Sequence, residues 1–266
     1  MYKRQVYGYA TNETLNYMPL PIELAHRLTN RLEECRENGI IQGLLPDGKS
    51  QVSIRYEGDS FDRITSVIIS TQHEDWKSFA DLTKEIEKNV VGKVLEEYDL
   101  TNTEILINPS GRFVLGGYEA DTGLTGRKLM VDTYGGIAHH GGGAMSGKDC
   151  SKVDRSGAYL ARYIAKNIAA AGLAERCEVS LSYVIGQPKP TAINIDTFYT
   201  GIVGESILRD AVEQVFDLSV NGAIETLGLK APFFAQTAVG GHFGRNGFAW
   251  ENTDKTEELK NAVFAR

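Results

Sequence analysis

The chain has 266 residues, 42% of them hydrophobic and 24% charged, which is typical of a folded protein with one large or two smaller cores. The net charge of −7 argues against a nucleic-acid partner, because binding a phosphate backbone requires an excess of Lys and Arg. Three cysteines without a CxxC pair indicate neither a disulfide framework nor a structural zinc site. An apolar run of about 18 residues and a secretory signal are both lacking, so we expect a cytoplasmic protein without a membrane partner.

The first half of the chain shows helical and strand periodicities in turn. Leucines at fourfold spacing predict an amphipathic helix, and alternating residues on either side of the Gly-centred turn Glu57–Asp59 predict a hairpin. The expected elements are a helix over Pro19–Asn38, strands over Gln51–Tyr56 and Arg63–Ser70, a helix over Trp76–Tyr98 and a strand over Glu104–Ile107.

The second half repeats this order of elements. It predicts a helix over Val153–Ala171, strands over Cys177–Ile185 and Thr191–Thr200, and a helix over Gly204–Phe216. The offset of about 130 residues is far longer than the period of solenoid repeats, which favours two related domains. Because hairpins predominate, we expect an α+β fold in which each domain has a mostly antiparallel sheet with helices on one face.

A glycine-rich segment, Asn108–Cys150, separates the two repeats and follows neither periodicity. Glycine lets the backbone approach a ligand closely, and long irregular loops in compact proteins are often functional. We therefore expect the chemistry of the protein in this segment.

Cations in and just after this segment suit a polyphosphate. Among glycines and acids they are Arg127, Lys128, Lys148, Lys152 and Arg155. Arg offers a bidentate fork and Lys a point charge, while Asp154 could hold Mg²⁺ together with phosphate oxygens. A solvated surface turn is the alternative interpretation of the same residues.

Further motifs and histidines are not interpreted as chemical sites. GGAMSGKD resembles a P-loop, but Asp149 stands where Ser or Thr should hold Mg²⁺ and no hydrophobic strand precedes it, so we reject that assignment. A hydrogen-bonding role for His139 and His140 is favoured over a metal site or a general base. His73 has no clustered partner, and His242 lies in the turn-like GGHFGR.

Five motifs in order and spacing resemble the S-adenosylmethionine synthetase (methionine adenosyltransferase) family. They are Gly8–Thr14 (GYATNET), Gly111–Gly117 (GRFVLGG), Gly123–Gly136 (GLTGRKLMVDTYGG), His140–Asp154 (HGGGAMSGKDCSKVD) and Gly241–Arg245 (GHFGR). The resemblance implies a family central domain over residues 6–114, a C-terminal domain over 115–255 and a tail over 256–266. Residues 1–5 resemble nothing in the family and are interpreted as a candidate non-native lead.

The resemblance also implies a reaction and its residues. The family condenses ATP with L-methionine and hydrolyses the triphosphate to phosphate and pyrophosphate, assisted by Mg²⁺ and K⁺, in homodimers or dimers of dimers. By position, the expected ATP contacts are Asp47, Lys49, Arg112, Phe113, Asp121, Arg127, Lys128, Ala144 and Lys148. The expected methionine contacts are Asp121, Lys152 and Ile185, and the magnesium ligand is Asp154. Lys49, Arg127, Lys148 and Lys152 are the expected catalytic residues.

The sequence also departs from the family pattern. The amino-terminal domain with its HPDK motif and the GDQG motif are not found, and Cys150 replaces a usual proline. Three interpretations follow: a shortened active synthetase, a catalytically impaired ATP-binding or regulatory subunit, and an incomplete gene product.

Overall fold

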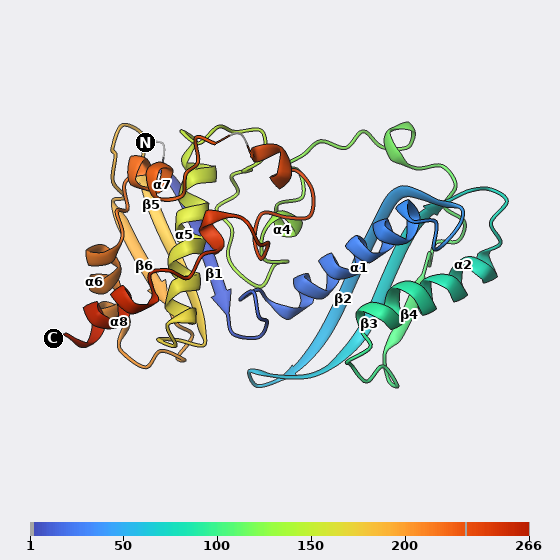
Figure 1. Ribbon diagram of the computed structural model, residues 1–266, viewed down its shortest axis with the longest axis horizontal. Coiled ribbons are helices and arrows are strands. Elements are labelled where there is room, and N and C mark those ends of the chain that lie inside the picture. The colour runs from blue at the N-terminus through green and yellow to red at the C-terminus, as the bar shows by residue number, and fades with distance from the viewer. Residues whose placement is uncertain (1–2, 232, 266) are drawn as a thin grey trace. The chain divides into compact units, whose positions relative to one another are not determined.

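The computed structural model describes residues 3–231 and 233–265, and the chain divides into two compact units (Figure 1). One unit, here the inserted unit, is Leu20–Leu124. The other, here the split unit, combines the chain up to Pro19 with the chain from Thr125 onward. Each unit contains a three-stranded sheet with helices, which confirms the predicted α+β class.

The inserted unit is built on a long hairpin. Its strands are β2 (Leu44–Glu57), β3 (Ser60–His73) and β4 (Glu104–Ile107), in the order β2-β3-β4. The hairpin β2–β3 is antiparallel, as predicted, whereas β4 lies parallel to β3. The helices are α1 (Leu20–Glu37), α2 (Phe79–Ile86) and the short α3 (Gly92–Val94).

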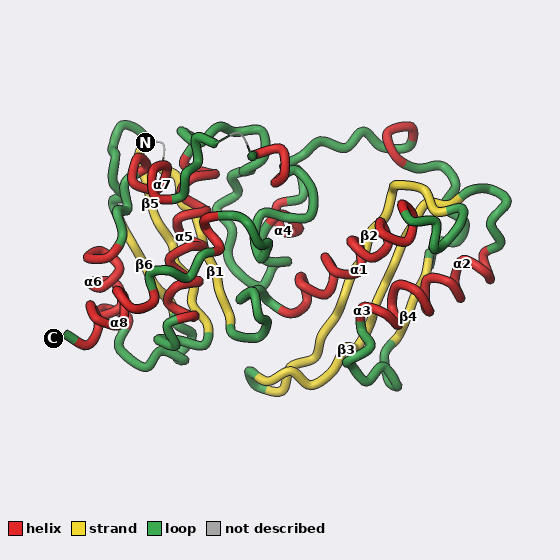
Figure 2. Tube along the Cα trace, viewed as in Figure 1, coloured by secondary structure: helices red, strands yellow, loops and turns green. Residues whose placement is uncertain are grey.

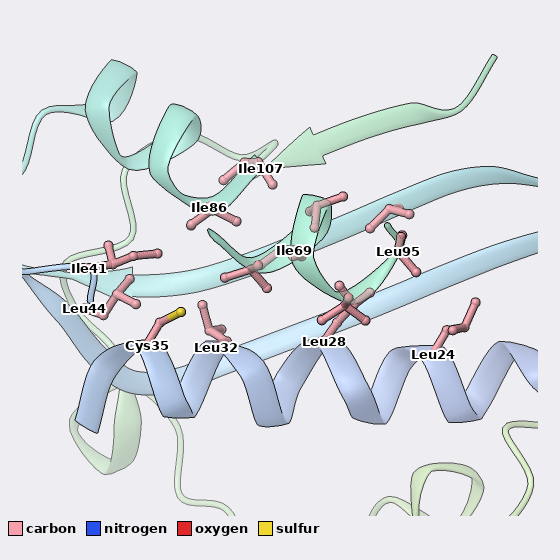
Figure 3. Packing of buried hydrophobic residues seen from close by; sticks show 14 of the residues in the cluster. Leu24, Leu28, Leu32, Cys35, Ile41, Leu44, Ile69, Ile86, Leu95 and Ile107 are labelled. Carbon is pink, nitrogen blue, oxygen red and sulfur yellow. The ribbon is translucent and has the colours of Figure 1, made fainter. Parts of the chain in front are cut away.

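The core of the inserted unit lies between α1 and the sheet. Leu24, Leu28 and Leu32 project from α1 toward the strands, and Ile69 of β3 and Ile86 of α2 pack into the same cluster (Figure 3). The fourfold leucine spacing puts these side chains on one face of the helix. The structure therefore confirms the helix predicted over Pro19–Asn38. Burial of its leucine face stabilises this helix.

The helix predicted over Trp76–Tyr98 begins later and is interrupted. Ser78 is its N-cap and accepts a hydrogen bond from the N–H of Asp81, so the helix starts only at Phe79. A π-helical turn, Glu87–Val91, then separates α2 from α3. The carbonyl of Asn89 in this turn accepts a hydrogen bond from Nε of Arg31 on α1, at 2.9 Å. Such a turn frees backbone groups for outside partners, which a purely periodic pattern does not reveal.

The split unit has a second sheet, in the order β1-β5-β6, with antiparallel pairs throughout. Its strands are drawn in yellow in Figure 2. Its strands are β1 (Lys3–Thr11), β5 (Arg176–Val184) and β6 (Ala192–Asp196). Its helices are α4 (Leu129–Asp132), α5 (Val153–Ala170), α6 (Glu205–Val215), α7 (Val220–Thr226) and α8 (Thr256–Phe264). The predicted helix and strand order of the second half is therefore confirmed, with a shorter last strand.

Strand β1 was not predicted from the sequence. Met1 and Tyr2, which belong to the candidate non-native lead, lie outside the described residues. The rest of that lead is part of β1 and pairs with β5. The register of the strand runs from Lys3 opposite Val184 to Thr11 opposite Arg176. Gly8 interrupts the alternating pattern that would have indicated a strand. In the structure, a Cβ added at Gly8 would lie 2.0 Å from the carbonyl carbon of Ala161 on α5. Glycine at this position therefore allows the strand and the helix to touch.

Strand β6 ends at Asp196 rather than at the predicted Thr200. The Asp196 carboxylate accepts a hydrogen bond from the N–H of Phe198 at 2.7 Å. Phe198 and Tyr199 then take positive φ angles of 51° and 62°. Such a turn, closed by an Asp side chain, cannot continue the strand.

A buried charge cluster ties α5 to the C-terminal segment. Arg162 is fully buried and donates from Nη2 to Glu251 at 2.8 Å and from Nη1 to the carbonyl of Tyr9 at 2.6 Å. Lys166 donates to the same carboxylate at 2.7 Å.

Within residues 3–231 and 233–265, no helix combines the length and apolar character that crossing a membrane demands.

Candidate functional site

The part of the glycine-rich segment that belongs to the split unit, residues 125–150 and here called the glycine-rich loop, lies directly on β1 and α5. A Cβ at Gly141 would lie 1.7 Å from the carbonyl oxygen of Gln5 on β1, and one at Gly143 would lie 2.3 Å from a carboxylate oxygen of Asp154. Both positions therefore require glycine, because any side chain would push the loop away. This contact brings the loop onto the first turn of α5.

Asp154, in the first turn of α5, is only 8% exposed and is held by two cations. Its Oδ2 accepts a hydrogen bond from Nζ of Lys148 at 2.6 Å, and its Oδ1 lies 3.9 Å from Nε of Arg4. The predicted triphosphate lysine and the predicted magnesium ligand are therefore in direct contact. Arg4, which the sequence did not single out, adds a third charge to this group.

A cavity of about 510 Å³ opens beside this ion pair. Its lining includes four residues predicted from the sequence and also Arg4: Arg4, Lys148, Lys152, Asp154 and Ile185. The lining contains three cations and one carboxylate, so it carries net positive charge. Ile185, with 69% of its surface exposed, supplies an apolar side chain just beyond the end of β5.

The start of α5 strengthens the positive character of the cavity. Lys152 precedes the first helical residue, and Ser151, Lys152 and Val153 all line the cavity. The first N–H groups of a helix have no acceptor within the helix, and its dipole places partial positive charge there. An anion in this cavity would meet both the lysines and this helix end.

The other predicted residues of the split unit lie beside the glycine-rich loop. Arg127 and Lys128 are exposed at the start of α4. Gly126 lies against Ala144, whose Cβ would be 3.1 Å from a Cβ added at Gly126. Among the described residues, the lining of the cavity includes none of Arg127, Lys128 and Ala144.

The inserted unit gathers a second set of predicted residues around the GRFVLGG segment. The Asp47 carboxylate accepts a hydrogen bond from the N–H of Gly117 at 2.9 Å, and the carbonyl of Gly117 accepts one from the N–H of Asp121 at 3.0 Å. Lys49 is exposed on β2, two residues beyond Asp47. Arg112 donates to the carbonyl of Asp75 at 2.8 Å and also pairs with its carboxylate.

His73 fixes Phe113 within this segment, a role that the sequence did not reveal. Nε2 of the fully buried His73 accepts a hydrogen bond from the N–H of Phe113 at 3.1 Å, and the N–H of His73 donates to the carbonyl of Phe113 at 2.9 Å. Nδ1 lies 2.9 Å from the carbonyl of Glu74, so the ring is neutral with its proton on Nδ1. Because the two residues are far apart in sequence, only the fold could reveal the pair.

The described residues offer a limited set of metal ligands. No group of three or more His, Cys, Asp or Glu side chains that could hold a metal ion occurs within 3–231 and 233–265. Asp154 presents a carboxylate beside a cavity that suits phosphate, and Mg²⁺ is commonly bound by one or two carboxylates together with substrate phosphates and waters. The donor chemistry at Asp154 therefore fits Mg²⁺ held jointly with a polyphosphate.

These features define an α+β protein with two sheet-based units and a candidate anion site at a glycine-rich loop. The model of the S-adenosylmethionine synthetase central domain matches residues 3–113, and the model of the S-adenosylmethionine synthetase C-terminal domain matches residues 115–252. The chain belongs to the S-adenosylmethionine synthetase family. The first match includes Lys3–Gln5, which are part of the candidate non-native lead.

Proposed function

We propose that this chain synthesises S-adenosylmethionine from ATP and L-methionine, with release of phosphate and pyrophosphate. The observation that carries the proposal is the cationic cavity that joins Lys148, Lys152 and Asp154 at the start of α5. Family membership supports the same reaction. We further propose a cytoplasmic homodimer or dimer of dimers, following the family resemblance.

The proposed first step is a displacement at the ribose C5′ of ATP. The methionine sulfur donates its electron pair to form the C–S bond, and the C5′–O bond breaks with its electrons leaving on the triphosphate. Lys148 and Lys152 would stabilise that charge electrostatically. Water then cleaves the triphosphate to phosphate and pyrophosphate.

The cofactors follow from the same charge. Mg²⁺, held by Asp154 and phosphate oxygens, would supply further stabilisation of the leaving group. Lys148, now paired with Asp154, would exchange this partner for phosphate oxygens as the substrate enters. K⁺ is proposed from the family resemblance.

The remaining predicted contacts are proposed for the nucleoside and methionine. Phe113, fixed by His73, would stack on adenine, and Arg112 would contact the nucleoside beside it. Asp47 and Lys49 would complete the nucleotide contacts, with Lys49 reaching a phosphate. For L-methionine, the proposed contacts are Asp121 with its amine, Lys152 with its carboxylate and Ile185 with its apolar side chain, and for the triphosphate they are Arg127, Lys128 and Ala144.

The test is an assay with ATP, L-methionine, Mg²⁺ and K⁺ that follows both S-adenosylmethionine and phosphate. Lys148→Ala removes a cation at the leaving group, and we expect a loss of turnover of at least about a hundredfold. Lys260→Ala is the matched control, because Lys260 lies on α8 and pairs with the exposed Glu257. Unchanged turnover in Lys148→Ala would overturn the assignment of this loop.

The second candidate function is a catalytically impaired ATP-binding or regulatory subunit. The observation that favours it is the pairing of Asp154 with both Lys148 and Arg4, because this pairing neutralises the carboxylate proposed for Mg²⁺. ATP binding without formation of S-adenosylmethionine would support this candidate. If the chain neither bound ATP nor formed S-adenosylmethionine, this result would support the third interpretation, an incomplete gene product.

A further inference from the structure

Two buried side chains form hydrogen bonds to the backbone turn that carries Lys148 or to a side chain on it. Nε of Arg155 donates to the carbonyl of Met145 at 2.7 Å, and Nε2 of His242 lies 2.9 Å from Oγ of Ser146. His242 is 0% and Arg155 2% exposed. Both contacts fall within three residues of Lys148 in sequence.

The turn itself is short and constrained. The carbonyl of Met145 accepts from the N–H of Lys148 at 3.4 Å as well as from Arg155, and Lys148 then reaches Asp154. A displacement of Ser146 would therefore move Lys148 with it.

His242 is fixed from several directions. Its Nδ1 lies 2.7 Å from the hydroxyl of Tyr159, its N–H donates to the carbonyl of Asp132 at 2.9 Å, and its carbonyl accepts from Nε1 of Trp250 at 2.9 Å. Burial, with Arg155 and Arg245 nearby, lowers the pKa of His242 to about 3, so the ring is neutral. A neutral imidazole has one donor and one acceptor, which Ser146 and Tyr159 together use completely.

We propose that His242 is a positioning residue that holds Ser146 and so presents Lys148 to an anion in the cavity. The identity of that anion, the triphosphate, rests on the proposed function. A buried polar pair gains little over an apolar pair in stability, because both groups lose hydration. Its specific gain is orientation, since a hydrogen bond fixes the loop where packing alone would allow it to slide.

Two substitutions of His242 separate the two ring nitrogens. In His242→Gln the amide lies near the position of Nε2 and retains a partner for Ser146, whereas in His242→Asn it lies near Nδ1 and retains only Tyr159. Ser146→Ala removes the loop contact from the other side, and Ser146→Thr restores the hydroxyl. Tyr159→Phe is the matched control, because it breaks the hydrogen bond that does not touch the loop.

The first measurement is the affinity for inorganic tripolyphosphate, by calorimetry on the full chain, beside the thermal midpoint of each variant. We expect Ser146→Ala and His242→Asn to weaken binding about tenfold, the equivalent of one hydrogen bond. Ser146→Thr, His242→Gln and Tyr159→Phe should bind within about threefold of the wild type. If affinity instead follows the thermal midpoint across all variants, His242 is merely structural and the proposal is wrong.

The second measurement needs no ligand and separates this inference from the proposed function. Hydrogen exchange of residues 145–148 should be faster in Ser146→Ala and His242→Asn than in Tyr159→Phe. If the wild type fails to bind tripolyphosphate but this difference is found, the positioning role stands and the proposed function falls. Equal exchange in all variants would overturn the positioning role.

Discussion

At the residue scale, the buried Glu251 carboxylate is the centre of a charge cluster in the split unit. It accepts hydrogen bonds from Arg162, Lys166 and the N–H of Gly244. Burial alone would raise the pKa of Glu251, but Arg162 and Lys166 outweigh it and the pKa is lowered. One carboxylate therefore compensates two buried cations.

Glu251→Gln removes that compensation while keeping the size of the side chain. We expect a loss of about 3–5 kcal/mol in the free energy of unfolding, because the buried Arg162 is left with an uncompensated charge. Urea denaturation near neutral pH measures the change. Glu258→Gln, which breaks an exposed pair with Lys255, is the control and should cost less than about 1 kcal/mol. A similar small cost in both variants would contradict this account of the cluster.

The sequence could reveal only part of the site at this scale. Lys148, Lys152 and Asp154 could be grouped from the sequence, because they are close in sequence and lie at or near the start of one helix. Arg4 could not be, since it reaches the cavity only through the pairing of β1 with β5. His73 and Phe113 show the same limit: their residue types carry no signal, and the fold alone makes them partners.

At the element scale, the contact between β1 and α5 depends on Gly8. In Gly8→Ala the new Cβ would meet the backbone of Ala161, which cannot rotate away as a side chain could. We expect a loss of about 1–3 kcal/mol or more in the free energy of unfolding, measured in urea. Gly123→Ala is the control, because among described atoms nothing lies within 4 Å of an added Cβ there. Equal stability of the two variants would show that β1 and α5 are not in such close contact.

Regular periodicity explains which elements could be predicted. The buried face of α1 and the alternation in the β2–β3 hairpin follow from side chains that lie on one surface, so local sequence contains the pattern. The π-helical turn Glu87–Val91 and the end of β6 at Asp196 are accompanied instead by individual hydrogen bonds, from Arg31 to the carbonyl of Asn89 and from the N–H of Phe198 to Asp196. Such contacts leave no repeating trace in the sequence.

At the scale of the whole molecule, the two units have separate cores. Leu28 is buried among α1, the β2–β3 hairpin and α2, while Ile164 is buried on α5. We expect Leu28→Ala and Ile164→Ala each to cost about 2–5 kcal/mol. The double variant should show the sum of the two losses within about 0.5 kcal/mol, because Leu28 and Ile164 belong to the cores of different units. A coupling energy above about 1 kcal/mol, from denaturation of all four proteins, would contradict separate cores.

The division into units was the hardest feature to predict. Repeated element order indicates two α+β bodies, and each contains the expected sheet. The sequence of β1, however, does not indicate that this strand pairs with β5 rather than with a strand of the inserted unit, which follows β1 directly in the chain. Pairing between distant strands is decided by the assembled sheet, which no local pattern describes.

Strand β1 also has a consequence for the order of biosynthesis. Strand β1 leaves the ribosome before the inserted unit, whereas its partner β5 emerges only after the complete inserted unit has been made. The inserted unit is continuous in sequence and can fold as it leaves the ribosome, since domains generally fold as units during synthesis. The first strand must meanwhile wait unpaired, and its late closure brings the high contact order that slows folding. Nascent chains stalled before β5 would thus expose an open strand edge to chaperones.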